Sequence, residues 1–431
     1  MVLMPHWPKK IITSNGITDL SRMEKLLAAL ENPHLRLPPA IHVAGTNGKG
    51  STCAMLKSIY KEAGYKVHLY TSPHLIHFNE RIEIAGQKIP DESLFHYLEK
   101  VRLAAEAIGL EPTFFEATTS AAFLAFAENQ ADLLIMETGM GGRLDPTNVI
   151  QKPLLTIITP ISYDHMEYLG PDIRLIAREK AGIIKKGVPC VISRQDESVI
   201  EILLSKCEEQ ASPAIAYEYD FIPEKNEAGF LFRSRLGDLE IGKLSLYGDH
   251  QIINASAVLA ACFIISKLNP ALILTEEKIA SGIIKAEWHG RLQKFDISRI
   301  AKKEIKASVY LDGAHNVAGA SALSDWLRSS CVNSRPVLIV GLTKNRDVGS
   351  FLSQFKDLNP IIYSVRVLSE PSAYTAERIA DKAKEVGIDV LSKDSVEEAL
   401  IDAAEDGGDI IVICGSLFLV SDCLKLGQNS G

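Results

Sequence analysis

Short apolar runs alternate with helical patterns along the whole chain. The runs are apolar throughout rather than at every second residue, which is typical of strands buried on both faces of a parallel sheet. Helical patterns lie between them, for example over Ser51–Ala63 and Glu116–Glu128, and Gly64 is placed to end the first of these helices. The predicted strands of this first series are Ile41–Ala44, Val67–Thr71, Leu133–Glu137, Leu155–Thr159 and Pro189–Ser193.

A second α/β series follows Arg291. The stretch Arg291–Lys306 is rich in charge and does not continue the preceding helical pattern, so we place a domain junction near residue 292. The sequence therefore predicts a doubly wound, mostly parallel sheet domain over residues 1–291 and a smaller Rossmann-like α/β domain over residues 292–431. Residues 219–247 are expected to form β-hairpins at the edge of the first domain. The predicted strands of the second series are Ser308–Leu311, Val337–Gly341, Ile361–Val365 and Asp409–Cys414.

Composition narrows the class of protein. A chain of 431 residues is long enough for two or three domains, and its net charge of −8 excludes a broadly basic nucleic-acid surface. The seven cysteines are scattered without a CxxC pair, which favours free thiols in a reducing compartment. The N-terminal residues MVLMPHWPKKIITSNG do not show the long apolar core that a signal peptide would have, and we expect the apolar stretches Ala255–Leu268 and Ile410–Val420 to be too short for a membrane span. We expect a soluble, cytoplasmic, monomeric protein with no nucleic-acid or membrane partner.

The segment IHVAGTNGKGST, residues 41–52, carries the clearest chemistry. A strand runs into a turn with Gly45, Gly48 and Gly50, where backbone N–H groups can converge on a phosphate at a helix N-terminus. Lys49 offers a positive charge for the β- and γ-phosphates, and Ser51 offers a hydroxyl for Mg²⁺. The strict GxxxxGK[ST] spacing is not met, and a glycine-rich turn that binds nothing is the alternative. Lysine, hydroxyl and both flanking elements together favour nucleotide binding.

Eight further sequence motifs, found in a fixed order along the chain, point to one protein family. The loop GTNGKGS resembles the ATP loop of the Mur ligase superfamily, and the other blocks occur in the order seen in the folylpolyglutamate synthase/dihydrofolate synthase family. The blocks are TSPHL with NERI (71–82), METGMGGRLDPTN (136–148), DHMEYLG (164–170), REKAGIIK (178–185), HQIINA (250–255), HGR (289–291), LDGAHN (311–316) and, more weakly, CGSLFLV (414–420).

The resemblance implies roles for individual residues. It implies ATP contacts from both domains, a metal site, a pterin pocket and a lysine, Lys180, that reacts with CO₂ to give a carbamate. The implied catalytic residues are Lys49, Lys180 and His165; the ATP contacts are Gly45, Thr46, Asn47, Gly48, Lys49, Gly50, Ser51, Asn254, Arg291, Asp312 and His315; the metal ligands are Ser51, Glu137 and His165; and the pterin contacts are Ser72, Phe115 and Asp145.

The residues alone leave several of these roles open. Glu137 ends a predicted strand and is suited to Mg²⁺, but it could equally be a turn residue. His165 is an unusual ligand for an ion that prefers oxygen. Lys180 could simply pair with Glu179. Many members of the family carry arginine where this chain has His77. A permanent cation near the expected pterin site is thus replaced by a side chain that titrates near neutral pH.

The resemblance implies an ATP-dependent amide ligase of folate metabolism that uses Mg²⁺, with K⁺ as a further candidate ion. Its substrates would be L-glutamate with dihydropteroate, tetrahydrofolate or both, joined through an acyl phosphate, because a free carboxylate is a poor electrophile. One alternative is a folylpolyglutamate synthase with that activity alone, and another is a Mur-type ligase of cell-wall precursors. Only 40 residues precede the first predicted strand, which is too few for the additional N-terminal domain of the cell-wall enzymes. A third alternative, a nucleotide-binding switch, would leave Glu137, His165 and Lys180 without a use.

Overall fold

The computed structural model describes residues 4–8, 19–297, 306–331, 334–405 and 409–429. Two compact units make up the chain: residues 1–245 with 251–287, and residues 246–250 with 288–431. Residues 298–305, half of the charged stretch Arg291–Lys306, lie outside the described residues. The seven cysteines are all described, and none of them forms a disulfide.

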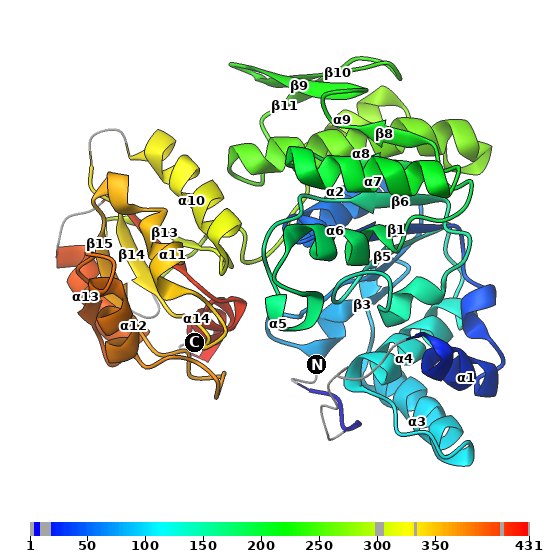
Figure 1. The fold of residues 1–431 in the computed structure, drawn as a ribbon, viewed down its shortest axis with the longest axis horizontal. Coiled ribbons are helices and arrows are strands. Elements are labelled where there is room, and N and C mark those ends of the chain that lie inside the picture. Colours follow the sequence, from blue (N-terminus) through cyan, green and yellow to red (C-terminus); the bar gives the residue numbers. More distant parts are fainter. Residues whose placement is uncertain (1–3, 9–18, 298–305, 332–333, 406–408, 430–431) are drawn as a thin grey trace. The chain divides into compact units, whose positions relative to one another are not determined.

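The first unit is built on an eight-stranded sheet with the order β4-β3-β2-β5-β1-β6-β7-β8 (Figure 1). Every pair from β2 to β8 is parallel, whereas β3 and β4 add an antiparallel edge. The predicted strands of the first series are confirmed to within one residue at either end. The strands are β1 (Ala40–Ala44), β2 (Val67–Tyr70), β3 (Ile82–Ile84), β4 (Gln87–Lys88), β5 (Leu133–Glu137), β6 (Leu155–Ile158), β7 (Cys190–Ile192) and β8 (Ala214–Ala216).

Helices cover both faces of this sheet, because successive right-handed crossovers that move in opposite directions lie on opposite faces. The crossover from β1 to β2 contains α2, whereas the one from β2 to β5 contains α4, which packs on Leu134 and Met136. Gly64 ends α2 with φ +91°, as predicted. The helices are α1 (Ser21–Ala29), α2 (Lys49–Glu62), α3 (Asp91–Ala107), α4 (Phe114–Glu128), α5 (Met166–Leu169), α6 (Ile173–Ala181), α7 (Glu197–Glu209), α8 (Asp249–Leu268) and α9 (Glu276–Ile284), with 3₁₀ turns η1 (Pro33–Leu35), η2 (Phe78–Arg81), η3 (Pro146–Val149) and η4 (Pro270–Leu272).

The region predicted as β-hairpins forms a separate antiparallel sheet, β11-β10-β9. Its strands are β9 (Phe221–Asn226), β10 (Gly229–Ser234) and β11 (Leu239–Gly242). Helix α8 extends the predicted apolar stretch at its N-terminal end, so that with 20 residues it is, within the described residues, the one helix long and apolar enough to cross a membrane. The expectation that this stretch is too short for a span was therefore wrong. Two thirds of its most apolar window is buried in the structure, which is typical of a core helix.

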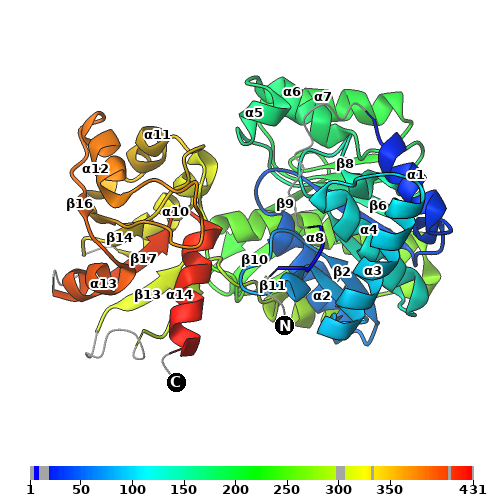
Figure 2. The same ribbon diagram turned by 90° about the horizontal axis from the view of Figure 1, so that it is seen from below.

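The second unit has a six-stranded sheet with the order β12-β13-β17-β14-β15-β16, parallel except for β12 (Figure 2). This arrangement confirms the second α/β series. The strands are β12 (Gln293–Lys294), β13 (Ser308–Leu311), β14 (Val337–Val340), β15 (Ile361–Ser364), β16 (Leu391–Ser392) and β17 (Ile410–Cys414). The helices are α10 (Val317–Ser330), α11 (Val348–Ser353), α12 (Ala376–Lys384), α13 (Val396–Glu405) and α14 (Leu417–Asn429), with the 3₁₀ turn η5 (Lys356–Leu358).

Candidate active site

The glycine loop lies between β1 and α2 at the carboxyl edge of the first sheet. Gly45 has φ +149° and Gly48 has φ +87°, and both conformations are unfavourable for any residue with a Cβ atom. Added Cβ atoms would also overlap the side chain of Thr159 at Gly45 and that of Asn254 at Gly48. The loop can therefore pack this closely against Thr159 and Asn254 only with glycine at both positions.

Two backbone groups of the loop are used inside the protein. The N–H groups of Thr46 and Asn47 both donate to the carbonyl of Pro160, at 3.0 and 3.1 Å. The hydroxyl of Thr46 donates to the carbonyl of Ser162, and the amide of Asn47 donates to the Ser162 hydroxyl. The loop is thus fixed to the segment that follows β6, and its free donors are those of the first turn of α2, where intrahelical partners do not exist. A phosphate bound here would contact the helix N-terminus, where the helix dipole favours an anion.

Lys49 and Glu137 lie together beside this helix N-terminus. Parallel pairing of β1 with β5 sets Val43 opposite Glu137, so the glycine loop and the carboxylate share one edge of the sheet. The Lys49 Nζ lies 3.8 Å from Glu137 Oε1 and 3.4 Å from the Thr46 carbonyl. Both side chains are largely buried. Solvent therefore screens this charge pair weakly.

Lys180 approaches the glycine loop from α6. Its buried Nζ donates to the carbonyl of Gly45 at 2.9 Å. The predicted alternative of a pair with Glu179 is not what the structure shows, because Glu179 bonds to Arg143 at 2.9 Å. Burial, together with the charge of Lys49, lowers the pKa of Lys180 to about 7, while the charge of Asp164 acts against the shift. The neutral amine of Lys180 is therefore far more accessible near neutral pH than that of an ordinary lysine.

The three predicted metal ligands differ in how well they suit Mg²⁺. Glu137 and Ser51 are buried oxygen donors next to the loop, which fits an ion that takes one or two protein oxygens along with phosphates. His165 follows the buried Asp164, and its side chain is 41% exposed with Nε2 3.9 Å from the Asp164 carboxylate. Among the described residues, no group of three His, Cys, Asp or Glu side chains could hold a metal alone. The donor set therefore fits an ion bound together with a nucleotide.

Asp145 organises the loop after β5. Its carboxylate accepts from the N–H groups of Gly139 and Met140 at 2.8 and 2.9 Å and from the N–H and hydroxyl of Thr147. The Thr147 hydroxyl also lies 2.8 Å from Nε2 of His42, a buried residue of β1. Burial raises the pKa of Asp145. Its predicted pterin contact stays a prediction, and within the protein it holds the backbone that follows Glu137.

The other predicted pterin residues flank the same edge. The Phe115 ring lies directly over Gly139, where an added Cβ would overlap it. It is also 6.0 Å from the ring of Tyr70, the last residue of β2. Ser72 is half-buried just beyond that strand. Aromatic rings and a hydroxyl at one edge are suited to a flat heterocycle.

Asn254 has contacts that its predicted role did not anticipate. It is buried on α8, donates to the Gln251 side chain at 3.0 Å and packs against Gly48. Its predicted contact with adenine stays a prediction.

The predicted ATP contacts of the second unit are grouped near the start of its sheet. Asp312 accepts from the N–H groups of Leu292 and Ala314, both at 2.8 Å. The Arg291 guanidinium lies over Gly313, and the His315 Nδ1 is 2.7 Å from the Gly313 carbonyl. Asp312 and His315 thus lie in one turn, and the Arg291 guanidinium lies against that turn.

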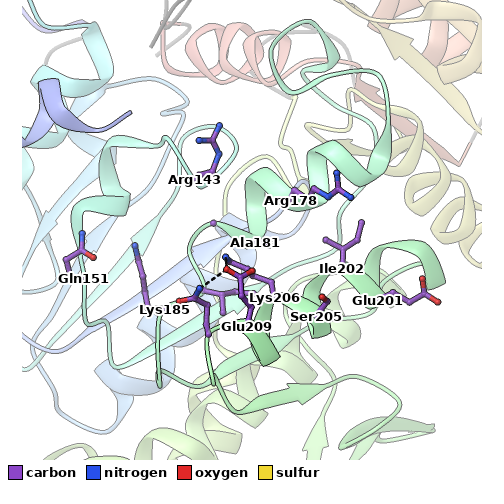
Figure 3. Close-up of a pocket in the computed structure, with 13 residues that line it drawn as sticks. Arg143, Gln151, Arg178, Ala181, Lys185, Glu201, Ile202, Ser205, Lys206 and Glu209 are labelled. Carbon is purple, nitrogen blue, oxygen red and sulfur yellow. Dashed lines mark hydrogen bonds and ion pairs between the residues drawn. The ribbon is translucent and has the colours of Figure 1, made fainter. Parts of the chain in front are cut away.

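A cavity of about 710 Å³ lies between α6, α7 and residues 143–151 (Figure 3). None of the predicted site residues lines it. Its cations are largely engaged within the protein: Arg143 pairs with Glu179, and Lys206 pairs with Glu209 at 2.8 Å.

Comparison with known proteins assigns the class. The model of the Mur ligase middle domain matches residues 43–262, and that of the dihydrofolate synthetase C-terminal domain matches residues 293–426. The first match includes the glycine loop, Glu137, His165 and Lys180. The chain is thus an ATP-dependent ligase of the Mur type.

Individual relatives narrow this class. The dihydrofolate synthase/folylpolyglutamate synthase of Bacillus subtilis is 36% identical over 94% of both chains, and the folylpolyglutamate synthase of Lacticaseibacillus casei is 32% identical over 94% of this chain and 93% of its own. A solved structure of E. coli FolC in complex with DHPP and ADP superposes with a TM-score of 0.85, at 29% identity, over 98% of this chain and 95% of that one. The chain belongs to the dihydrofolate synthase/folylpolyglutamate synthase family, whose members carry out ATP-dependent glutamate ligation in folate metabolism.

Two features of the site were missed from the sequence. His42 and Thr147 support Asp145, and a histidine inside an otherwise apolar strand was the available signal. Arg81, in the NERI block, is a cation largely enclosed by aromatic rings. The block was noted in the sequence, but no role was assigned to its arginine.

Proposed function

We propose that this protein joins L-glutamate to dihydropteroate and also to tetrahydrofolates, so that it has both activities named in the Bacillus subtilis relative. The observation that carries the proposal is the convergence of Lys49, Glu137 and Lys180 on one glycine loop. An alternative is the folylpolyglutamate synthase activity alone, since the Lacticaseibacillus casei relative is named only for that reaction.

The arrangement suits carboxylate activation by ATP. The triphosphate binds at the first turn of α2, where backbone N–H groups and Lys49 offset the charge that develops on the transferred γ-phosphoryl group. The substrate carboxylate attacks that phosphorus and ADP leaves, which gives an acyl phosphate. The amine of L-glutamate then attacks the acyl carbon, phosphate leaves, and an amide is formed. No protein nucleophile is required, so the residues act by positioning and by charge neutralisation.

Glu137 and Ser51 are the residues that would hold Mg²⁺, with His165 as a further candidate beside them. The ion supplies positive charge to the phosphates of bound ATP. The Lys49 Nζ lies 3.8 Å from Glu137 Oε1, and the attraction between the two charges holds the carboxylate beside the loop. K⁺ is a further candidate, and a comparison of potassium with sodium salts tests it.

The direct test is ADP release measured with dihydropteroate and with tetrahydrofolate in parallel, each with and without L-glutamate. We expect glutamate-dependent release with both acceptors. ADP release with tetrahydrofolate but not with dihydropteroate would favour the alternative, folylpolyglutamate synthase activity alone. Tight ATP binding without glutamate-dependent release from either acceptor would contradict the proposed reaction.

We further propose that Lys180 is carbamylated. Carbamate formation needs a neutral amine, whose nitrogen attacks the carbon of CO₂ and then loses a proton, and the pKa of about 7 makes that form abundant. The product is an anion beside the loop, able to orient a cation bound with ATP.

In ¹³C-bicarbonate we expect a carbamate resonance that is absent from Lys180→Met. Lys185→Met is the matched control, because burial lowers the pKa of Lys185 to about 8 but its Nζ donates to the Asn148 carbonyl, away from the glycine loop. A resonance that survives in Lys180→Met would contradict the assignment.

We propose that the protein acts as a cytoplasmic monomer. We also propose that residues 1–291 bind ATP and that residues 292–431 form the glutamate ligase domain. Sedimentation of the purified protein tests the monomer, and separate expression of the two segments tests the division.

A further inference from the structure

Arg81 is a cation enclosed by aromatic side chains in unit one. Its Cζ lies 5.2 Å from the ring centre of Phe78 and 5.8 Å from that of Phe114. Its Nε donates to Nδ1 of His74 at 2.9 Å. Two rings and one hydrogen bond therefore set the direction of the guanidinium.

The segment that carries Arg81 is itself well ordered by hydrogen bonds. The carboxylate of Glu80 accepts from the N–H groups of Leu75, Ile76 and His77, at 2.8, 3.3 and 3.1 Å. The N–H of Thr71 donates to the carbonyl of Arg81 at 3.0 Å, which joins the segment to the end of β2. Hydrogen bonds thus fix the backbone of residues 71–81 on both sides of the turn that carries Arg81.

The guanidinium has more donors than the protein uses. It carries five N–H groups. Within the described residues, its only hydrogen bond is the one to His74. Burial lowers the pKa of Arg81, while the charge of Glu137 acts against the shift. Arg81 is half-buried, and a partly desolvated cation with spare donors favours an anionic ligand that can accept from them.

The sheet register places Arg81 near the reacting end of the site. Tyr70 of β2 pairs with Ile82 of β3 on one side and with Met136 of β5 on the other. Arg81 and Glu137 therefore lie two strands apart at the same edge, about 10 Å between backbones at the usual strand spacing. The long arginine side chain can cover much of that gap.

We propose that Arg81 binds the reacting carboxylate of the folate-type substrate and positions it for attack on the γ-phosphoryl group; this rests on the proposed function. A planar guanidinium fork matches a carboxylate with two parallel hydrogen bonds. The rings of Phe115 and Tyr70 at the same edge suit the flat part of such a substrate. The phosphates have their own cation, Lys49, which follows β1, three strands along the sheet from β3. Arg81 is thus a substrate-binding residue distinct from the ATP loop.

The test compares two ligands on the full-length protein with ADP present. One is dihydropteroate, and the other is the same compound without its carboxylate. We expect the wild-type protein to prefer dihydropteroate by about 10- to 100-fold in Kd, the range for a hydrogen-bonded charged pair. Arg81→Gln should abolish this preference by weakening only the carboxylate ligand, with the Kd of ADP unchanged. Arg81→Lys, which keeps the charge but not the fork, should give an intermediate preference.

Lys57→Gln is the matched control. Lys57 also lies near β3, but its Nζ is bonded to both oxygens of Glu83, at 2.9 and 3.1 Å. Removal of this charge should leave the ligand preference intact. Equal weakening of both ligands in Arg81→Gln, or a preference retained in that variant, would overturn the proposal. Absence of glutamate-dependent ADP release from the wild-type protein would instead contradict the proposed reaction, because the binding preference is measured without turnover.

Discussion

Replacement of Lys49 by alanine should reduce glutamate-dependent ADP release by about 10²- to 10³-fold with either acceptor, the range for loss of one group that stabilises transition-state charge. Lys49 is a side-chain cation at the first turn of α2, and its Nζ is 3.8 Å from the Glu137 carboxylate. Its removal takes positive charge from the phosphates and leaves Glu137 without this partner. Both effects act against phosphoryl transfer.

The matched control for this variant is Lys61→Ala, in the last turn of the same helix, where the side chain is exposed. It removes an equal charge from α2 and should retain wild-type turnover. Thermal unfolding of both variants separates lost chemistry from lost structure. A folded Lys49→Ala variant with near-normal turnover would contradict the assignment of the glycine loop to ATP.

Replacement of Lys180 by methionine should lower turnover by about 10²-fold and also change how stability depends on pH. The pKa of Lys180 is about 7 in the folded protein and 10.5 in its ordinary state. Between these values the unfolded chain binds the proton and the folded protein does not, so the free energy of unfolding rises with pH. This contribution is about 2 kcal/mol between pH 7 and pH 9, and it is lost as the pH falls toward 7.

Lys180→Met removes that contribution because methionine does not titrate. Denaturant unfolding in CO₂-free buffer, repeated at several pH values, should therefore give a flatter pH profile for the variant than for the wild-type protein. Loss of the bond to the Gly45 carbonyl lowers the stability by a similar amount at every pH, so it does not change the slope. Lys186→Met, at an exposed neighbouring position, is the control and should keep the wild-type profile. Parallel profiles for wild type and Lys180→Met would contradict the buried amine.

The strand predictions succeeded because buried parallel strands are marked locally. Each run is mostly apolar, as in residues 133–136, and is followed by a glycine or a polar turn. The glycine loop was predictable for the same reason, since Gly45 and Gly48 sit between a strand and a helix in consecutive residues. The start of α8 was less predictable, because polar residues at its first turns hide the helix that precedes the apolar stretch.

The interactions inside the site depend on residues far apart in the chain. The sequence suggested that backbone N–H groups of the loop converge on a phosphate, whereas the N–H groups of Thr46 and Asn47 donate to Pro160, more than 100 residues away. Asp145 was predicted to contact the pterin. Within the protein, its carboxylate accepts hydrogen bonds from the backbone N–H groups of Gly139 and Met140. These hydrogen bonds depend on how β1, β5 and β6 lie next to one another, which no local pattern specifies.

The sequence by itself determined the two α/β series, the glycine loop between the first strand and its helix, and the family, because each of these is specified by neighbouring residues whose spacing is fixed by strand and helix geometry. The tertiary structure alone decided that the Lys180 amine meets the Gly45 carbonyl, that Glu179 pairs elsewhere, and that Arg81 is enclosed by Phe78 and Phe114. The physical reason is that burial and charge pairing are properties of the packed edge of the sheet. Burial and charge pairing shift the pKa of a side chain, or leave a hydrogen-bond donor available to a ligand, only after distant segments of the chain have packed together and displaced the water between them.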